Sequence, residues 1–166
     1  DGVGLSDTSL VINLAIDIVY PMIDSISPPP GTISWLDQQI SVRFTQRMQE
    51  TGFSPDFIEI ESKYSDVISA EFNYVDSIRT VFMDLSHGFA GMDSITITLD
   101  AAGIKSHYGY PIDADGNSEG GDNYLIEYTS GYIADYDGNM IINGADLSTF
   151  ISSYQENDYL HELGPY

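Results

Sequence analysis

Cysteine is absent from this chain of 166 residues, which excludes disulfides and thiolate metal ligands. Basic residues are scarce as well: five Lys and Arg stand against 26 Asp and Glu, for a formal net charge of −21. Because phosphate binding needs clustered Lys and Arg, we expect no nucleic-acid partner, and an anionic membrane surface is disfavoured for the same reason. No run of 18 or more apolar residues occurs, so we expect no membrane insertion.

Signatures of catalysis are missing too. The chain contains no Gly-x-Ser-x-Gly elbow, phosphate-binding loop or His-Glu-x-x-His motif. Its three histidines, His87, His107 and His161, are far apart, and none has the spacing of a zinc ligand. Acidic residues lie in loops or alternate along strand faces. We therefore expect a protein that is not an enzyme.

The chain does contain enough apolar sequence for a folded core, with 42% hydrophobic residues and twelve Tyr. Its acidic residues are mostly Asp, 18 against eight Glu, and several stand in loops rich in Gly and Asn. Turns and binding sites for hard cations both favour the short Asp carboxylate. A strongly acidic surface also suits saline surroundings or simple solubility, so both explanations stay open.

Apolar and polar residues alternate with period two along most of the chain, which predicts short β-strands. Clusters of turn-forming residues separate them, such as Pro28–Gly31 and the stretch 113–122. Seven such strands without helical patterns between them indicate an all-β fold, an Ig-like antiparallel β-sandwich. The strands are expected at residues 10–18, 40–44, 58–60, 68–74, 81–85, 95–99 and 124–128.

Near the C-terminus the period changes to that of a helix. Apolar residues fall at i, i+3, i+4 and i+7, which predicts a short amphipathic α-helix that starts near Asp146 and carries a stripe of Leu147, Phe150, Ile151 and Tyr154. A carboxylate at that point also complements the positive end of the helix dipole.

Directly before this helix, oxygen-bearing side chains occupy alternate positions of a loop, with the spacing by which an EF-hand-type loop surrounds a divalent cation. Ca²⁺ takes roughly six to eight oxygens at about 2.3–2.6 Å, and a tightly turning loop supplies them from alternate residues. The alternative is a turn that only resembles a ligand pattern. We predict a Ca²⁺ site with side-chain ligands and one backbone carbonyl, that of Ile141; the side chains are Asp135, Asp137, Asn139, Asn143 and Asp146.

A second stretch shows the first half of the same pattern. No acidic residue stands at its twelfth position, and the alternative is a solvated hairpin loop. We predict a second Ca²⁺ site with the ligands Asp113, Asp115, Asn117, Glu119 and Asp122. Filling both sites would add four positive charges to the formal charge of −21 and relieve repulsion among the carboxylates.

Residues 8–19 form a long apolar run of period two ahead of Pro21. This stretch is the first strand of the sandwich, the last strand of a preceding domain, or a strand donated to the sheet of a neighbouring subunit. The chain is accordingly divided into an N-terminal strand (1–20), a sandwich (21–130) and a calcium loop with its helix (131–166).

Residues 25–129 resemble the bacterial Ig-like modules found in tandem in surface-layer and adhesin-type proteins. The segments that carry the resemblance are Ser27–Gly31 leading into Ile40–Phe44, then Ile95–Leu99, Gly103 with Ile104, and Tyr110–Asn117 before a last strand. The resemblance implies a spacer, display or adhesive role outside the cell, and no catalysis.

Residues 131–166 look like half of a dockerin-type module. Dockerins carry two calcium loops, each followed by a helix, and dock onto cohesins. Only one loop with its helix is evident here, and Met140 stands at position 6, where the pattern has Gly. Without a twin, the apolar stripe of the helix is expected to pack on the sandwich. The side-chain ligand positions of the family match at Asp135, Asp137, Asn139 and Asp146.

Together these features predict an extracellular, calcium-binding structural or adhesive module of a bacterial cell-surface protein. Its partners would be neighbouring domains or identical subunits of a surface assembly. One alternative is a fibre subunit that assembles by donating residues 8–19. Another is a module that binds a cohesin or a glycan, the latter through surface tyrosines such as Tyr108 and Tyr110.

Overall fold

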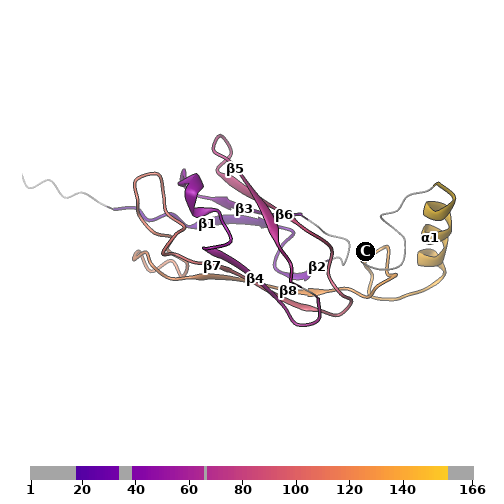
Figure 1. The fold of residues 1–166 in the computed structure, drawn as a ribbon. Helices are drawn as coiled ribbons and strands as arrows, with labels where there is room; N and C mark the ends of the chain where they lie inside the picture. The colour runs from indigo at the N-terminus through magenta and orange to yellow at the C-terminus, as the bar shows by residue number, and fades with distance from the viewer. Residues whose placement is uncertain (1–17, 34–38, 66, 157–166) are drawn as a thin grey trace, which may run out of the picture.

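Two four-stranded β-sheets pack face to face in the computed structural model, which describes residues 18–33, 39–65 and 67–156 (Figure 1). The first sheet has the order β1-β3-β6-β5 and is antiparallel throughout. Its strands are β1 (Ile23–Ser27), β3 (Gln39–Phe44), β5 (Ala70–Val75) and β6 (Thr80–Leu85).

The second sheet has the order β2-β8-β7-β4, with β2 and β8 parallel and the other pairs antiparallel. Its strands are β2 (Gly31–Ile33), β4 (Ile58–Ser62), β7 (Ser94–Leu99) and β8 (Tyr124–Ser130). A short 3-10 helix, η1 (Glu50–Gly52), follows β3, and the helix α1 (Gly144–Glu156) comes last.

The core lies between the two sheets and is built from alternate residues of each strand. Period two places one set of side chains toward the opposite sheet and leaves the others outside. The prediction of an all-β, Ig-like β-sandwich is confirmed. The fully buried apolar strand residues are Ile33, Ile40, Val42, Phe44, Val81, Met83, Ile95, Ile97, Leu99 and Ile126.

Six of the seven expected strands correspond to β3–β8, whereas β1 and β2 were missed. The register of β1 on β3 shifts between Ile23 and Ser25, so its apolar residues lose the period of two. β2 has only three residues, and it directly follows a Pro-rich stretch that reads as a turn. The chain therefore changes sheets at Pro28–Pro30, where the sequence predicted only a loop.

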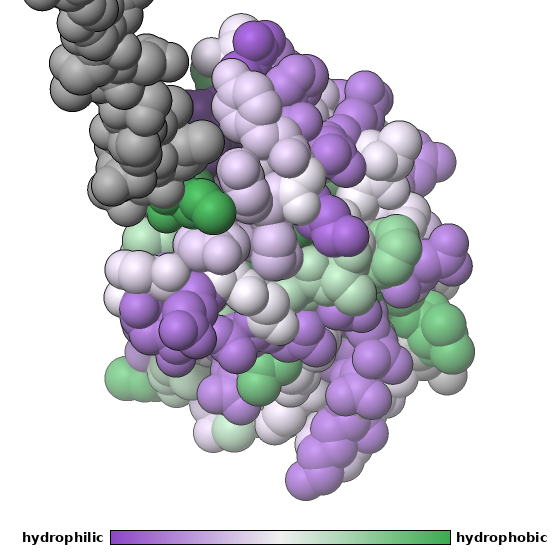
Figure 2. Space-filling model, turned by 90° about the vertical axis from the view of Figure 1, so that its left-hand side faces the viewer, coloured by the Kyte–Doolittle hydropathy of each residue, from purple (hydrophilic) through white to green (hydrophobic). Residues whose placement is uncertain are grey.

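The strand expected over residues 8–19 lies mostly outside the described residues, and Ile18 and Val19 are in no strand. None of its three interpretations is tested, and the domain boundaries also stay predictions. Figure 2 looks onto the end of the sandwich where residues 18–22 lie. It shows a largely hydrophilic surface with a few separate hydrophobic patches. No helix in the described part of the chain is long and apolar enough to cross a membrane.

The helix α1 forms as predicted and starts two residues before Asp146. It stands beyond the end of the sandwich, away from both sheets (Figure 1). Leu147 is 58% exposed and Tyr154 is 67% exposed. The expectation that the stripe of α1 packs on the sandwich is therefore wrong, although Phe150 does stack between Tyr136 and Tyr154.

A buried carboxylate, Asp93, fastens the loop after β4 to the start of β7. Its side chain is fully buried and accepts hydrogen bonds from the Ser62 and Ser65 hydroxyls. The backbone N–H groups of Lys63, Tyr64 and Ser65 also donate to it, at 2.9–3.0 Å. The Asp93 carboxylate thus takes the place of water as the hydrogen-bond acceptor for the donors of this turn.

Ionisation of Asp93 is favoured by the same contacts. Burial opposes the charged form, but the hydrogen bonds from Ser62, Ser65 and the backbone outweigh it and hold the pKa of this carboxyl below its ordinary value of 3.8. A depressed pKa means that ionised Asp93 stabilises the fold at neutral pH. This contribution is lost as the pH falls from about 4 through the folded pKa.

Replacing Asp93 with Ala is expected to lower the free energy of unfolding by about 2–4 kcal/mol, because five partly buried donors lose their acceptor. Urea denaturation at pH 7 measures this, and the difference from wild type should shrink as the pH falls below 4. The control is Asp84→Ala on the exposed side of β6, where Asp84 accepts a hydrogen bond from Gln39. Equal destabilisation by both substitutions would contradict the role of Asp93.

Candidate metal-binding loops

Three carboxylates meet in the loop before α1. Asp135, Asp137 and Asp146 each place one oxygen within 4.8 Å of the others. Asp135 and Asp146 are only 3% and 1% exposed, whereas Asp137 is exposed. Across the described residues, no other group of three or more His, Cys, Asp or Glu side chains comes together in this way.

Backbone N–H groups aim these carboxylates inward. The Asp135 carboxylate accepts from the N–H groups of Asn139 and Met140, at 3.1 and 2.7 Å. The Asp146 carboxylate accepts from Tyr136 at 2.9 Å and from Asn143 at 2.8 Å. Residues at both ends of the loop are therefore tied across it, which closes the loop on itself.

The same contacts start the helix. Oδ1 of Asn143 accepts the N–H of Ala145 at 2.8 Å, while Asp146 accepts the N–H of Asn143. Asp146 thus reaches back to the N–H of Asn143 as in a capping box, although the Asn143 oxygen accepts from Ala145 and not from Asp146. Asp146 accepts hydrogen bonds from the N–H of Asn143 and, with smaller effect, from those of Tyr136 and Asp137. Together they outweigh the effect of burial and lower the pKa of the Asp146 carboxyl. Asp146 is therefore ionised at neutral pH, as a metal ligand must be.

Two residues in the loop adopt the left-handed backbone conformation that makes the turn tight. Gly138 has a φ of 70° and Met140 a φ of 66°. A glycine accepts this conformation without cost, but a Cβ adds about 1–2 kcal/mol of strain. The preference for Gly at position 6 of such loops thus has a local physical reason here, and Met140 carries the strain.

The remaining predicted ligands, Asn139, Ile141 and Asn143, are exposed and are joined to the loop by hydrogen bonds. Oδ1 of Asn139 accepts the N–H of Ile141 at 2.8 Å, and its Nδ2 donates to Asp137. The carbonyl of Ile141 accepts from Nδ2 of Asn143 at 3.1 Å. All six predicted groups therefore belong to one hydrogen-bonded loop, of which the three carboxylates form the tightest group.

The second predicted site repeats the first turn of this loop. Asp113, which is 4% exposed, accepts the N–H groups of Gly116 and Ser118 at 2.8 and 3.0 Å. Asn117 donates to Asp115 through both its N–H and its Nδ2. Gly116 and Ser118 have φ values of 74° and 71°, at the same loop positions as Gly138 and Met140.

The second half of the pattern is not repeated. Glu119 and Asp122 are exposed, and they form no three-membered group with the carboxylates of Asp113 and Asp115. The structure thus brings Asp113, Asp115 and Asn117 into one turn. The N–H of Glu119 also donates to Oδ1 of Asn117 at 2.7 Å, but the carboxylates of Glu119 and Asp122 do not join those of Asp113 and Asp115.

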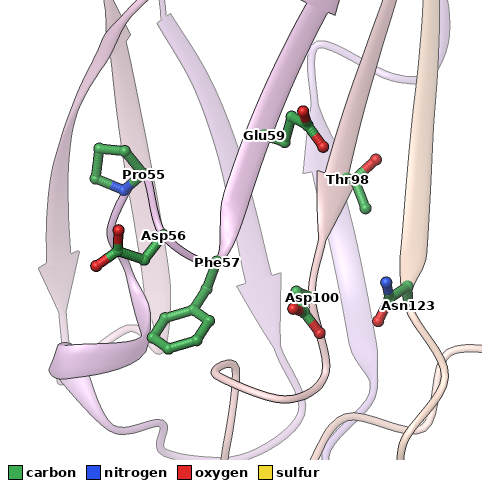
Figure 3. A pocket seen from close by; sticks show the side chains of 7 residues that line it. All are labelled: Pro55, Asp56, Phe57, Glu59, Thr98, Asp100 and Asn123. Carbon is green, nitrogen blue, oxygen red and sulfur yellow. The ribbon is translucent and has the colours of Figure 1, made fainter.

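A pocket that the sequence did not predict lies on the outer side of β4 and β7. It has a volume of about 300 Å³, and Figure 3 shows side chains from both strands and from their flanking loops around it. Glu59 and Thr98 are paired across the two strands. The lining combines three carboxylates with one aromatic ring and contains no His or Ser. Its residues are Pro55, Asp56, Phe57, Glu59, Thr98, Asp100 and Asn123.

The fold and the sequence together define the class as an Ig-like β-sandwich. The chain belongs to the family described as bacterial Ig-like domain, whose sequence profile matches residues 17–118. That range covers β1–β7 and the loop around Asp113, and it ends before β8, the Asp135 loop and α1. No curated protein matches the chain.

Solved structures show a distant likeness. The N-terminal part of the bacterial S-layer protein SbsC is 16% identical with a TM-score of 0.47, over 68% of this chain and 24% of that one. CopC from Methylosinus trichosporium OB3b is 15% identical with a TM-score of 0.46, over 67% of this chain and 93% of that one. These values describe a remote similarity in fold and nothing more. The chain spans about a quarter or less of the S-layer proteins it matches.

Met140→Gly is expected to stabilise the 135–146 loop by up to about 1 kcal/mol, because the left-handed strain that glycine removes outweighs the partial burial lost with the Met140 side chain, which is 40% exposed. Thermal unfolding and Ca²⁺ titration measure this as a higher melting temperature or a lower Kd. Gly138→Ala is the matched substitution of opposite sign, since it adds a Cβ at a φ of 70°. If both substitutions weaken the loop, the strain assigned to Met140 is wrong.

Proposed function

We propose that this chain is a calcium-binding structural module of a bacterial cell-surface protein and acts outside the cell without catalysis. Its membership of the bacterial Ig-like domain family, which is not a catalytic family, supports the surface setting and the structural role. The chain enters at one end of the sandwich and reaches α1 at the other (Figure 1), which suits a spacer between neighbouring domains or identical subunits.

The convergence of Asp135, Asp137 and Asp146 is the observation that carries the calcium proposal. Three carboxylates whose oxygens lie within 4.8 Å of one another repel, and the burial of two of them strengthens that repulsion. A hard divalent cation offsets it, and oxygen ligands from alternate residues of one loop favour Ca²⁺ over Mg²⁺. Asn139, Asn143 and the Ile141 carbonyl complete a set of six oxygens.

In this role the ion would link the start of the loop to the first turn of α1. Asp135 and Asp137 belong to the segment that leaves β8, and Asp146 belongs to the helix. Coordination by all three fixes where α1 stands relative to that segment. The Asp113 loop, with Asp115 and Asn117, is proposed as a second and weaker site, since fewer of its carboxylates converge.

The exposed stripe of α1 favours a second candidate function, docking onto a cohesin-like partner. Leu147, Ile151 and Tyr154 are 46–67% exposed and lie on one side of a helix. An apolar helix face of this kind is the ordinary means by which a helix binds a groove. Pull-down with cohesins, using Leu147→Asp as the non-binding variant, separates docking from a purely structural role.

Calcium is expected to raise the melting temperature between EDTA and millimolar CaCl₂, with a stabilisation of about 2.7 kcal/mol when free Ca²⁺ is 100 times its Kd. Asp135→Asn removes a charge from the first loop and should abolish most of this shift. Asp84→Asn, on the exposed side of β6, is the control and should leave the shift unchanged. A melting temperature of the wild type that does not respond to calcium would refute the proposal.

A further inference from the structure

The second sheet has a gap beside β8. This strand pairs with β7 along residues 124–129, whereas β2 covers only residues 128–130 on its other side. Across the described residues, no strand and no backbone hydrogen bond occupies that other side of residues 124–127, which we call the β8 gap. Because the N–H and C=O groups of a strand point alternately to its two sides, the β8 gap presents unpaired backbone groups in line with β2.

The core is incompletely covered beside the β8 gap. β1 and β2 follow one another in the chain and are the edge strands of the two sheets on the same side of the sandwich. Ile23 and Ile26 of β1 and Tyr124 of β8 pack against the core but are only partly buried. A hollow of about 570 Å³ adjoins the gap, and its lining includes Pro30, Gly31, Leu125 and Glu127. The gap therefore offers a strand edge together with apolar surface that is still to be covered.

An uncharged stretch near the start of the chain suits this gap. Residues 8–16 lie between Asp7 and Asp17 and contain no charged residue, in a chain whose formal net charge is −21. A strand without charge is not repelled by such an acidic protein. In an extended chain the alternate residues of this stretch form one apolar face, which matches the partly buried side chains beside the gap. The residues of this face are Leu10, Ile12, Leu14 and Ile16.

Residues 18–22 direct this stretch away from its own sandwich. Nε2 of Gln46 donates to the carbonyl of Val19 at 2.8 Å, and the N–H of Asp113 donates to the carbonyl of Pro21 at 2.8 Å. Followed back through these residues, the chain runs outward from the end of the sandwich (Figure 1). Pairing with its own β8 would need a sharp reversal directly before this anchored segment. The β8 gap of a second copy needs none.

The β8 gap is open at one end only. Gly31, the first residue of β2, closes the far end. The open end lies by Tyr124, where β8 begins, and the loop 113–122 that leads to β8 lies against Tyr20. The C-terminal end of a donated strand continues into its own sandwich, so it must leave by the open end. The donated strand then runs antiparallel to β8, and it leaves at the end of the sandwich where residues 18–22 enter.

We propose that two copies of this chain exchange strands, with residues 8–16 of each copy paired to residues 124–127 of the other. Because the chain enters the sandwich at the open end of the gap, the exchange is mutual and a twofold axis closes the dimer. Backbone hydrogen bonds supply the affinity, and the alternate apolar side chains set the register. The two α1 helices then stand at the outer ends (Figure 1). The exchange needs no calcium, so it is independent of the proposed cation sites.

Light scattering of the full chain in EDTA tests the dimer, which is expected at twice the mass of 18.3 kDa. Leu14→Asp places a carboxylate on the face that covers the core and should weaken the dimer about 100-fold or more, since this charge would be buried without a partner. Asn13→Asp is the matched control. It adds the same charge one position away, on the opposite face of the strand, and should leave the dimer intact.

Cross-linking identifies which copy holds the donated strand. The chain has no cysteine, so Ala15→Cys and Leu125→Cys introduce the only two thiols, both on the outer face. In the double variant a short bis-maleimide should join them between two copies and give a covalent dimer on a denaturing gel. Adding Leu14→Asp to this variant should abolish the covalent dimer.

Four results would overturn the exchange. A wild type that stays monomeric at micromolar concentration has no such dimer, and a cross-link within one copy places the strand on its own β8. Oligomers larger than a dimer contradict the closed twofold arrangement. A dimer that survives Leu14→Asp, or is lost equally in Asn13→Asp, does not use the assigned apolar face. Calcium binding is measured separately, so the two proposals fail independently.

Discussion

Backbone N–H groups turned onto buried aspartates hold the loops of this sandwich in place. Asp93 accepts N–H groups of the turn after β4, and Asp113 accepts those of the loop beside residues 18–22. Asp135 and Asp146 accept those of the loop before α1. Each carboxylate satisfies donors that would otherwise need water, and so each loop keeps one conformation. The two sheets supply the core, but these side chains determine how the chain arrives at the sandwich and how it leaves.

This arrangement gives the excess of aspartate a structural meaning. Asp is short enough to fold back onto its own neighbours within two to five residues, whereas Glu more often extends into solvent. Buried Asp side chains at 0–4% exposure are accommodated because several N–H donors surround each of them. The formal charge of −21 is therefore not only a property of the surface.

The sequence predicted those parts whose signal is local and periodic. The period-two strands β3–β8, the start of α1 and the spacing of the 135–146 loop all depend on residues a few positions apart. β1 was hidden by a shift in register, and β2 by its length of three residues beside a Pro-rich turn. Asp93 carried no signal, because its partners stand about 30 positions away along the chain. The pocket of Glu59 and Asp100 likewise depends on strand pairing that no local pattern reveals.

The parallel pairing of β2 with β8 has a mechanical consequence. β2 follows the first strand of the sandwich and β8 is the last, and the two run in the same direction side by side. Tension applied between residues 18–22 and α1 would pull β2 and β8 in opposite directions along their length. Their hydrogen bonds, which cross between the strands, would then be loaded together in shear and not opened one after another. A sandwich built in this way resists stretching at its shortest strand.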